Sequence, residues 1–336
     1  MGSHEETLPL VTVAVICYNH AQFVIEALES IKVQAYQNLH LLVLDDCSED
    51  DSASIIRHWL NRNYPDAVFV EHKVNVGVCR TVNDALTHAK GKYLRFLAAD
   101  DRWIPNTLAQ QIEIMEAVPE DVGVLYSDAL LINERGDPLP GTFIELHRTF
   151  AEMPEGWIFD TLTRGNFIPA MTAVIRLRCV EVVGAVDEGL ITEDWDMWLR
   201  ISRHFKFKYL PGPTAYYRML QTSMTRTRHD DIVDSERRMF VKCLRRGWLT
   251  GEKKQEAIDA EYWEACRAYL LGLPDRTQEA ASTFRHRMSV KHALLLSFVL
   301  VGLPYQRFDA TVMLLSKMKR RAELILARCG IGREPR

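Results

Sequence analysis

The first hundred residues alternate between short apolar runs and amphipathic stretches. The apolar runs are rich in β-branched residues and predict buried strands at residues 10–17, 39–44, 67–70 and 93–98. Between them, apolar side chains recur at helical spacing and predict helices at residues 21–33, 50–62 and 78–89. Strands and helices that alternate through short links are typical of a doubly wound α/β sheet.

The pattern changes after residue 101. We expect a helix at 105–118, a strand at 122–132, an irregular segment at 139–170, a strand at 173–175, helices at 177–183 and 194–204, and two strands at 205–210 and 214–219 around a Pro-Gly-Pro turn. From about residue 227 only helices are expected, at 230–249, 252–272, 277–287, 290–301 and 305–329. The chain therefore predicts an α/β domain at residues 8–225 and a helical domain at 226–336.

Polar side chains follow three of the four predicted strands. Tyr18 comes after the first, Asp46 after the second, and Asp100 and Asp101 after the fourth. Ligands of open α/β sheets bind at the carboxyl ends of strands, so these residues are expected to meet at one edge. Any one cluster taken alone is better explained as a helix cap or a loop, and only the three together favour a site.

Composition excludes several classes of protein. The 336 residues are 47% hydrophobic and 26% charged, with a net charge of −4, so neither disorder nor a global attraction to nucleic acid is expected. The seven cysteines form no CxxC pair, which argues against a zinc site or a disulfide framework. The chain shows no signal-peptide pattern, and its longest nearly apolar run, 293–304, is too short to span a bilayer. We expect a cytoplasmic protein.

The acidic strand ends suggest a particular chemistry. Paired aspartates suit oxygen-ligand cations such as Mg²⁺ or Mn²⁺, which commonly serve phosphate groups. The chain contains neither GxxxxGK[ST] nor GxGxxG, so a bound nucleotide phosphate would be neutralised by metal. Tyr18 can stack on a base, and Asp46 can accept the imide N–H of uracil or thymine.

A fourth acidic cluster lies at the start of a predicted helix. Glu193, Asp194 and Asp196 fall within four residues and are interleaved with two tryptophans. The helix dipole favours acids there, and N-terminal capping explains one of them. An additional acid facing an acceptor could serve as a general base.

Several blocks, taken in order, resemble one known family. They are Tyr18-Asn19, Asp45-Asp46-Cys-Ser48-Glu-Asp50, Asn75-Val-Gly77, Asn83, Ala89-Lys-Gly91-Lys-Tyr93, Asp100-Asp101, Arg164-Gly165-Asn166, Val174-Ile-Arg176, Gly184-Ala-Val-Asp187-Glu188, Glu193 to Arg200, Tyr217-Arg218 and Ser223. Over about residues 8–225 the chain resembles family-2 glycosyltransferases, inverting enzymes with the GT-A fold. The resemblance implies transfer of a hexosyl or N-acetylhexosaminyl group from a nucleotide-sugar, with UDP expected, in bacterial polysaccharide or glycoconjugate synthesis.

The resemblance also implies roles on the donor side. Tyr18 and Asp46 would hold the nucleotide base. Asp100 would contact the ribose, and Asp101 the Mg²⁺ or Mn²⁺ that bridges the diphosphate. Arg80 would approach the nucleotide.

On the acceptor side, the resemblance makes Asp194 the catalytic base, with Glu193 and Trp198 shaping the site. The acceptor would be a glycan, a lipid-linked glycan or a protein-linked glycan. Two departures weaken the metal site. An acid that often precedes the aspartate pair is missing, and Leu220 stands where relatives often have a histidine. His229 is a candidate substitute, although a solvated loop histidine explains it better.

Two alternative functions and two roles for the C-terminal helices stay open. A sugar-nucleotide nucleotidyltransferase would need a basic, glycine-rich loop, and residues 17–22 lack one. A non-catalytic nucleotide-sugar binder would not need Asp101 and Asp194. Residues 306–336 carry eight basic and three acidic side chains beside apolar positions. They are expected to pack or form a homo-oligomer, and peripheral contact with the inner face of the cell membrane is the alternative.

Overall fold

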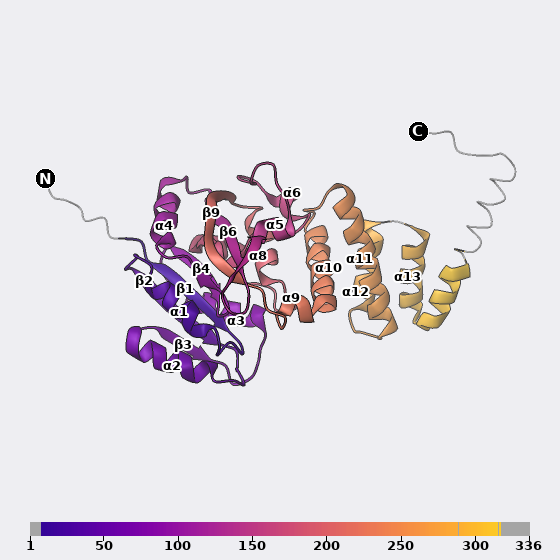
Figure 1. Cartoon of the computed structure of the whole chain (residues 1–336). Coiled ribbons are helices and arrows are strands. Elements are labelled where there is room, and N and C mark those ends of the chain that lie inside the picture. Colours follow the sequence, from indigo (N-terminus) through magenta and orange to yellow (C-terminus); the bar gives the residue numbers. More distant parts are fainter. Residues whose placement is uncertain (1–7, 288, 315, 317–336) are drawn as a thin grey trace. The chain divides into compact units, whose positions relative to one another are not determined.

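The computed structural model describes residues 8–287, 289–314 and 316 (Figure 1). The chain divides into two units, Met1–Glu236 and Arg237–Arg336. The first unit contains the sheet and the helices around it. The second is helical throughout its described residues.

The first unit is built on a mixed nine-stranded sheet. Its strands are β1 (Val11–Cys17), β2 (Leu39–Asp45), β3 (Val68–Glu71), β4 (Tyr93–Ala98), β5 (Arg102–Trp103), β6 (Val122–Ile132), β7 (Pro138–Thr142), β8 (Val174–Arg176) and β9 (Lys206–Arg218). Their order is β3-β2-β1-β4-β8-β6-β9-β5, with β7 paired to β6. The first four are parallel, as the alternating pattern predicts, and β8 is antiparallel to both of its neighbours. The predicted α/β class is confirmed.

Helices cover both faces of this sheet (Figure 1). The helices that begin and end in the first unit are α1 (Val24–Lys32), α2 (Ser52–Asn63), α3 (Val78–His88), α4 (Thr107–Ala117), α5 (Phe143–His147), α6 (Phe159–Leu162), the 3-10 turn Ala170–Thr172, α7 (Leu177–Val183), α8 (Glu193–Ile201) and α9 (Met224–Thr227). Helices α1, α2 and α4 share one apolar cluster with β1, β2 and β4. Helix α3 contacts β1 and β2 as well as α8, which brings the acidic start of α8 toward the strands.

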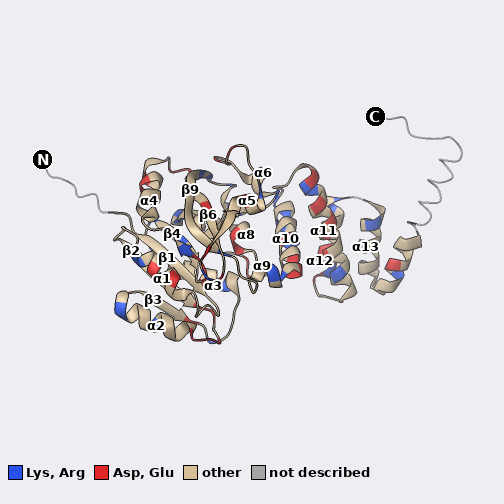
Figure 2. Ribbon diagram, viewed as in Figure 1, with Lys and Arg blue, Asp and Glu red and all other residues tan. Residues whose placement is uncertain are grey.

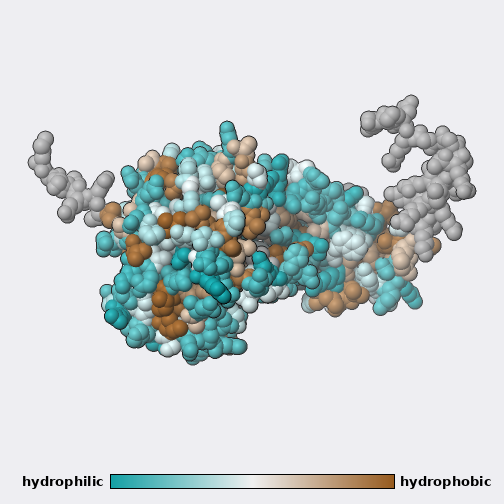
Figure 3. Space-filling view, in the orientation of Figure 1, coloured by the Kyte–Doolittle hydropathy of each residue, from teal (hydrophilic) through white to brown (hydrophobic). Residues whose placement is uncertain are grey.

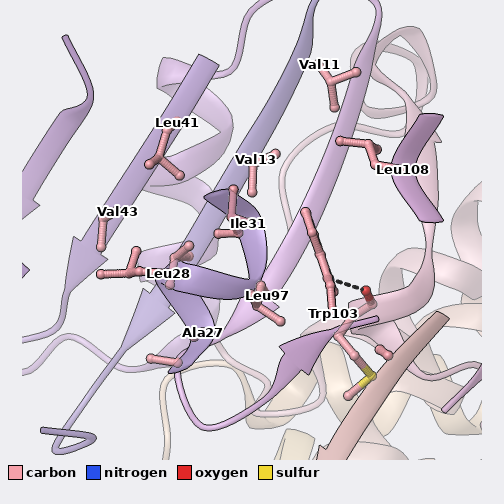
Figure 4. Packing of buried hydrophobic residues seen from close by; sticks show 14 of the residues in the cluster. Val11, Val13, Ala27, Leu28, Ile31, Leu41, Val43, Leu97, Trp103 and Leu108 are labelled. Carbon is pink, nitrogen blue, oxygen red and sulfur yellow. Dashed lines mark hydrogen bonds between the residues drawn. The ribbon is translucent and has the colours of Figure 1, made fainter. Parts of the chain in front are cut away.

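Alternate residues of the central strands form the core (Figure 4). Val11 and Val13 of β1 and Leu97 of β4 are fully buried in one cluster, because alternate strand residues point to the same face. Thr12 and Ala14 are equally buried, which shows that both faces of β1 are covered. The indole N–H of Trp103 donates to the Met171 carbonyl at 2.9 Å. Gly91 precedes β4 with φ +86°, and a side chain there would collide with the Leu10 backbone. The core therefore fixes the strands whose ends carry the candidate residues.

One predicted pair of strands is wrong. The Pro-Gly-Pro segment lies inside a single strand, β9, which continues through residues 211–213. Its register against β6 shifts between Tyr126 and Ala129, so the ladder tolerates two residues that lack an N–H. β9 therefore carries Arg218 without interruption to the edge where β4 ends.

The second unit is a helical array. Helix α10 (His229–Arg245) reaches into it, followed by α11 (Gly251–Leu270), α12 (Arg276–His286), α13 (Val290–Val301) and a helical segment at residues 305–314. The fully buried carboxylate of Glu261 accepts hydrogen bonds from Arg245 and Ser282 and pairs with His286. Within the described residues, no helix has both the length and the apolar character needed to cross a membrane. The part of the predicted 305–329 helix after Ser316 lies outside the described residues.

Candidate active site

The carboxyl ends of β1, β2 and β4 lie next to one another. Cys17 pairs with Asp45, and Ile16 pairs with Ala98, in parallel registers. The Asp46 N–H donates to the Cys17 carbonyl, and the Ala99 N–H donates to the Ile16 carbonyl, both at 2.9 Å. The polar residues that follow the three strands are thus brought to one edge of the sheet, as expected.

Short polar side chains shape the loop after β1. Asp45 accepts the Ser48 N–H at 2.8 Å and its hydroxyl at 2.6 Å, and Ser48 in turn accepts the Asn19 N–H at 2.8 Å. Asn19 has φ +56°, which reverses the chain directly after Tyr18. Tyr18 is 42% exposed, so its ring is available for stacking. Asp50 accepts the N–H groups of Ala21 and Ser52 at 2.9 and 3.0 Å, which ties the loop after β1 to the start of α2.

Asp46 is nearly fully buried and well supported. Its Oδ1 accepts the Val76 N–H, and its Oδ2 accepts the Gly77 N–H, each at 2.9 Å. The Nδ1 atom of His72 lies 2.8 Å from the same Oδ1. These contacts hold the carboxylate in one plane and tie the end of β2 to the start of α3. Arg80 lies on the first turns of α3 and is exposed.

The end of β4 is held by a buried arginine of β9. The Arg218 backbone N–H donates to Asp101 Oδ1 at 2.9 Å, and its Nε donates to the Asp100 carbonyl at 2.7 Å. The guanidinium also pairs with Glu26 at 2.7 Å. His20 Nε2 lies 3.8 Å from Asp100 Oδ2. Burial, and then the charge of Asp100, raise the pKa of the Asp101 carboxyl well above its usual range.

Three acids open α8, and they have different environments (Figure 2). Asp196 is buried and pairs with Arg200 at 2.8 Å, which is a structural contact. Asp194 Oδ1 accepts the Trp195 N–H at 2.6 Å, and Oδ2 accepts the Asn166 amide at 2.8 Å. Burial raises the pKa of Asp194 against these hydrogen bonds. Burial and then the Asp194 charge raise the pKa of Glu193 to about 8.

A cavity of about 130 Å³ joins the two acidic regions. Its lining includes Asp101 from the end of β4 and Glu193, Asp194 and Trp198 from α8. Ile16, Leu97, Met171 and Met197 are among the apolar residues that complete it. Two of the predicted functional carboxylates therefore line one partly open cavity, where charge interactions are stronger than in bulk water.

The side chains of the site could bind a divalent cation only together with ligands from outside the protein. Among the described residues, no group of three or more His, Cys, Asp or Glu side chains is arranged to hold a metal ion. Asp101 nevertheless offers a buried carboxylate whose charge is disfavoured by burial and by Asp100, and a cation would offset that cost. His229 is exposed at the start of α10. The arrangement suits an ion that takes its remaining ligands from a diphosphate.

Sequence reasoning missed three residues that support the site. His72 contacts Asp46, and Asn166 contacts Asp194. Arg218 donates to the Asp100 carbonyl and to the Asp101 carboxylate. Asn166 and Arg218 stand in blocks that carry the resemblance, but spacing alone assigns them no partner. His72 had no sequence signal, because only the folded chain brings it to Asp46.

Comparison with known proteins identifies the class of this domain. Residues 12–163 match the model of glycosyl transferase family 2. An uncharacterized glycosyltransferase of Rickettsia prowazekii is 28% identical over 58% of this chain and 59% of its own length. The putative teichuronic acid biosynthesis glycosyltransferase TuaG of Bacillus subtilis is 26% identical over 65% of this chain and 82% of its own length. The matched region spans between 32% and 61% of the length of the first Rickettsia relatives.

Two solved structures share the fold. Staphylococcus aureus TarS in complex with UDP-GlcNAc superposes with a TM-score of 0.56 at 17% identity, covering 85% of this chain and 83% of that one. The mannosyltransferase PcManGT of Pyrobaculum calidifontis, in complex with GDP-Man and Mn²⁺, gives 0.55 at 19% identity, covering 92% and 84%. The likeness establishes the GT-A fold, as predicted from the sequence.

Proposed function

Because the N-terminal part of this chain belongs to glycosyl transferase family 2 and has the GT-A fold, we propose that it transfers a sugar from a nucleotide-diphospho-sugar to an acceptor hydroxyl, with inversion. The observation that carries the proposal is the single cavity lined by both Asp101 and Asp194. Inversion needs a base on one side of the anomeric carbon and charge stabilisation at the leaving diphosphate on the other. Two carboxylates that line one cavity could fill these two roles, Asp194 as the base and Asp101 on the diphosphate side.

Asp194 is the proposed catalytic base. In its ionised form it takes the proton of the acceptor hydroxyl while the acceptor oxygen forms a bond to the anomeric carbon. The bond from that carbon to the β-phosphate oxygen breaks, and its electron pair leaves with the nucleoside diphosphate. The raised pKa of Asp194 supports this role, because a base with a pKa nearer neutrality accepts a proton more effectively.

Asp101 is the proposed ligand of a Mg²⁺ or Mn²⁺ ion. When bound, such an ion supplies Lewis-acid stabilisation of charge on the diphosphate. The Arg218 N–H fixes one oxygen of Asp101, so the carboxylate keeps its orientation. Support for a metal also comes from PcManGT, which was solved with Mn²⁺.

Tyr18, Asp46, Asp100 and Arg80 form the proposed nucleotide site. Exposed Tyr18 would stack on the base. Oδ2 of Asp46 accepts only the Gly77 N–H among its assigned hydrogen bonds, so a lone pair remains for an imide N–H. Asp100 would contact the ribose, and Arg80 would approach the diphosphate. We propose a UDP-sugar as donor, in keeping with the UDP-GlcNAc complex of TarS.

The proposed product is a glycan bond on a polysaccharide or glycoconjugate. The transferred group would be a hexose or an N-acetylhexosamine, and the acceptor a glycan, a lipid-linked glycan or a protein-linked glycan. TuaG, whose name refers to teichuronic acid biosynthesis, supports a polysaccharide acceptor. Nucleotide release from a panel of UDP-, GDP- and dTDP-sugars, with candidate acceptors and Mn²⁺, tests the proposal. The absence of release from every donor would contradict it.

Residues 8–225 form the proposed transferase domain, and residues 226–336 a helical accessory domain for self-assembly. Exposed apolar side chains on the second unit support an assembly surface (Figure 3). Leu300 and Val301 at the end of α13 are 65% and 71% exposed. Light scattering of the Leu300→Glu and Val301→Glu double variant should then report a smaller particle than the wild type. Flotation with anionic liposomes tests the alternative, docking at the inner membrane face, which requires wild-type protein to float and the variant to float less.

A further inference from the structure

The predicted base is held by a neighbouring amide that no motif assigns. Asn166 Nδ2 donates to Asp194 Oδ2 at 2.8 Å, and the Trp195 N–H holds the other carboxylate oxygen. Each carboxylate oxygen carries two lone pairs, and the Asp194 N–H also bonds to the carboxylate, so at least one lone pair remains for an acceptor hydroxyl. With both oxygens engaged, the plane of the carboxylate is fixed.

The orientation of the Asn166 amide is itself fixed. Its oxygen accepts the Ile168 N–H at 3.1 Å, so its NH₂ group must face Asp194. Phe167 and Ile168 are fully buried and anchor this segment. A second contact joins the same segment to α8, because the Trp195 indole donates to the Leu162 carbonyl at 2.9 Å. The amide is therefore a rigid donor aimed at a single carboxylate oxygen.

Other charged and titratable groups around Asp194 act less directly. Glu193 precedes it on α8, and the charge of Asp194 raises the pKa of Glu193. His147 of α5 favours ionisation of Asp194. Cys79 of α3 faces the acids of α8, and Asp101 lies elsewhere in the lining of the cavity. The Asn166 amide contributes the side-chain hydrogen bond to Asp194, and it favours the anion.

We propose that Asn166 is the positioning residue of the transfer reaction, whose amide N–H fixes the Asp194 carboxylate and favours its anionic, proton-accepting form. This inference rests on the proposed role of Asp194 as base. Asn166 does not itself exchange a proton. Its single hydrogen bond leaves a lone pair of the Asp194 carboxylate for an acceptor hydroxyl and offsets part of the cost of a buried negative charge.

The first test is the pH profile of nucleotide release by the full chain, using the panel donor that is turned over fastest. Asn166→Ala should move the acidic midpoint of kcat/KM upward by about one pH unit, since it removes a hydrogen bond to a charged group. Asn166→Asp, nearly isosteric, should move it further by adding a like charge. Rates should recover partly at high pH. An unmoved midpoint with a uniform loss of rate would show a structural role and overturn the proposal.

Asn83→Ala is the matched control. Asn83 joins α3 to the segment before α8 through both polar atoms of its amide, which bond to the Val186 backbone, and it bonds to Glu188 rather than to Asp194. This variant should lower the melting temperature and leave the midpoint in place. If Asn83→Ala shifts the midpoint as much as Asn166→Ala does, a general loosening of the fold explains both shifts.

A second test needs no activity. In a double-mutant cycle of Asn166→Ala and Asp194→Asn, the stability coupling should be large at pH 8, where Asp194 is charged, and smaller at pH 4. Coupling that does not change with pH would overturn the proposed support of the anion. The failure of the parent hypothesis is separate. If Asp194→Asn keeps its activity, Asp194 is not the base. If Asp194→Asn is inactive but the pH profile of Asn166→Ala is unshifted, only the positioning role of Asn166 is wrong.

Discussion

Replacing Glu193 with glutamine should stabilise the protein in a pH-dependent way. Glu193 begins α8 beside Asp194, and burial followed by the Asp194 charge raises its pKa from 4.5 to about 8. A carboxyl whose pKa is raised on folding loses stability as pH increases, because the unfolded chain gives up the proton first. The penalty starts near pH 4.5 and is complete above pH 8.

The size of the effect follows from the shift. From 4.5 to about 8, at about 1.4 kcal/mol per pKa unit, the shift corresponds to roughly 5 kcal/mol. Glu193 keeps part of its surface in water and its titration depends on that of Asp194, so about 2–3 kcal/mol should be observed. Glu193→Gln should thus match the wild type near pH 4 and exceed it by about that amount at pH 8.5.

Urea unfolding of both proteins at pH 4, 6.5 and 8.5, followed by circular dichroism, measures this difference. The control is Glu181→Gln, because Glu181 is an exposed glutamate of the neighbouring helix α7. Its stability difference from the wild type should stay small at every pH. If the stability advantage of Glu193→Gln over the wild type does not grow with pH, then the start of α8 does not raise the pKa of Glu193 as described.

Three other predictions concern the site. Asp194→Asn should keep its fold and bind the donor nucleotide, but transfer should fall about 10²-fold or more in the nucleotide-release assay. Near-normal transfer would exclude Asp194 as the base. Chelation should abolish activity, and Asp101→Ala should weaken binding of UDP more than binding of uridine in calorimetry, because the ion offsets diphosphate charge. Full activity in chelator would indicate a metal-independent enzyme. Arg218→Leu should destabilise the chain by about 2–3 kcal/mol in urea unfolding, since the Asp100 and Glu134 carbonyls lose a donor. Glu26 is 41% exposed and adds little to this loss. A loss below about 1 kcal/mol would contradict that role.

Hydrophobic periodicity predicted the elements that pack against a core. The structure has β6 at the predicted residues 122–132, and α7 at 177–183. β6 is buried along nearly its whole length and therefore reads as a continuous apolar run, whereas α7 buries Cys179 and leaves much of its surface in solvent. The strand ends were predictable for the same reason, because parallel neighbours bring their carboxyl ends to one edge.

Elements that depend on tertiary contacts were harder to predict from the sequence. The expected irregular segment 139–170 includes most of β7 and all of α5 and α6. β7 pairs with β6 despite its two prolines and a glycine, and α6 has only four residues, too few for a period. Helix α5 did carry a signal. Thr142 and Glu145 form a capping box, which is readable as Thr-x-x-Glu.

The residues of the candidate site likewise fall into those that the sequence predicted and those that only the fold revealed. Strand ends and the acidic helix start made Asp101 and Asp194 candidates, and only the fold shows that both line one cavity. Supporting residues lie far away in sequence. Asn166 is 28 residues from Asp194, and Arg218 is 117 residues from Asp101. No spacing rule links such pairs, because loops and a bulged strand set the distances between them.

The most direct measurement of the central claim is nucleotide release from the sugar-nucleotide panel by wild-type protein and by Asp194→Asn, each with Mn²⁺ and with chelator. The account predicts metal-dependent release from at least one donor by the wild type, and about 10²-fold less release by the variant despite retained donor binding. It would be contradicted if the wild type released no nucleotide from any donor, or if the variant released it at the wild-type rate.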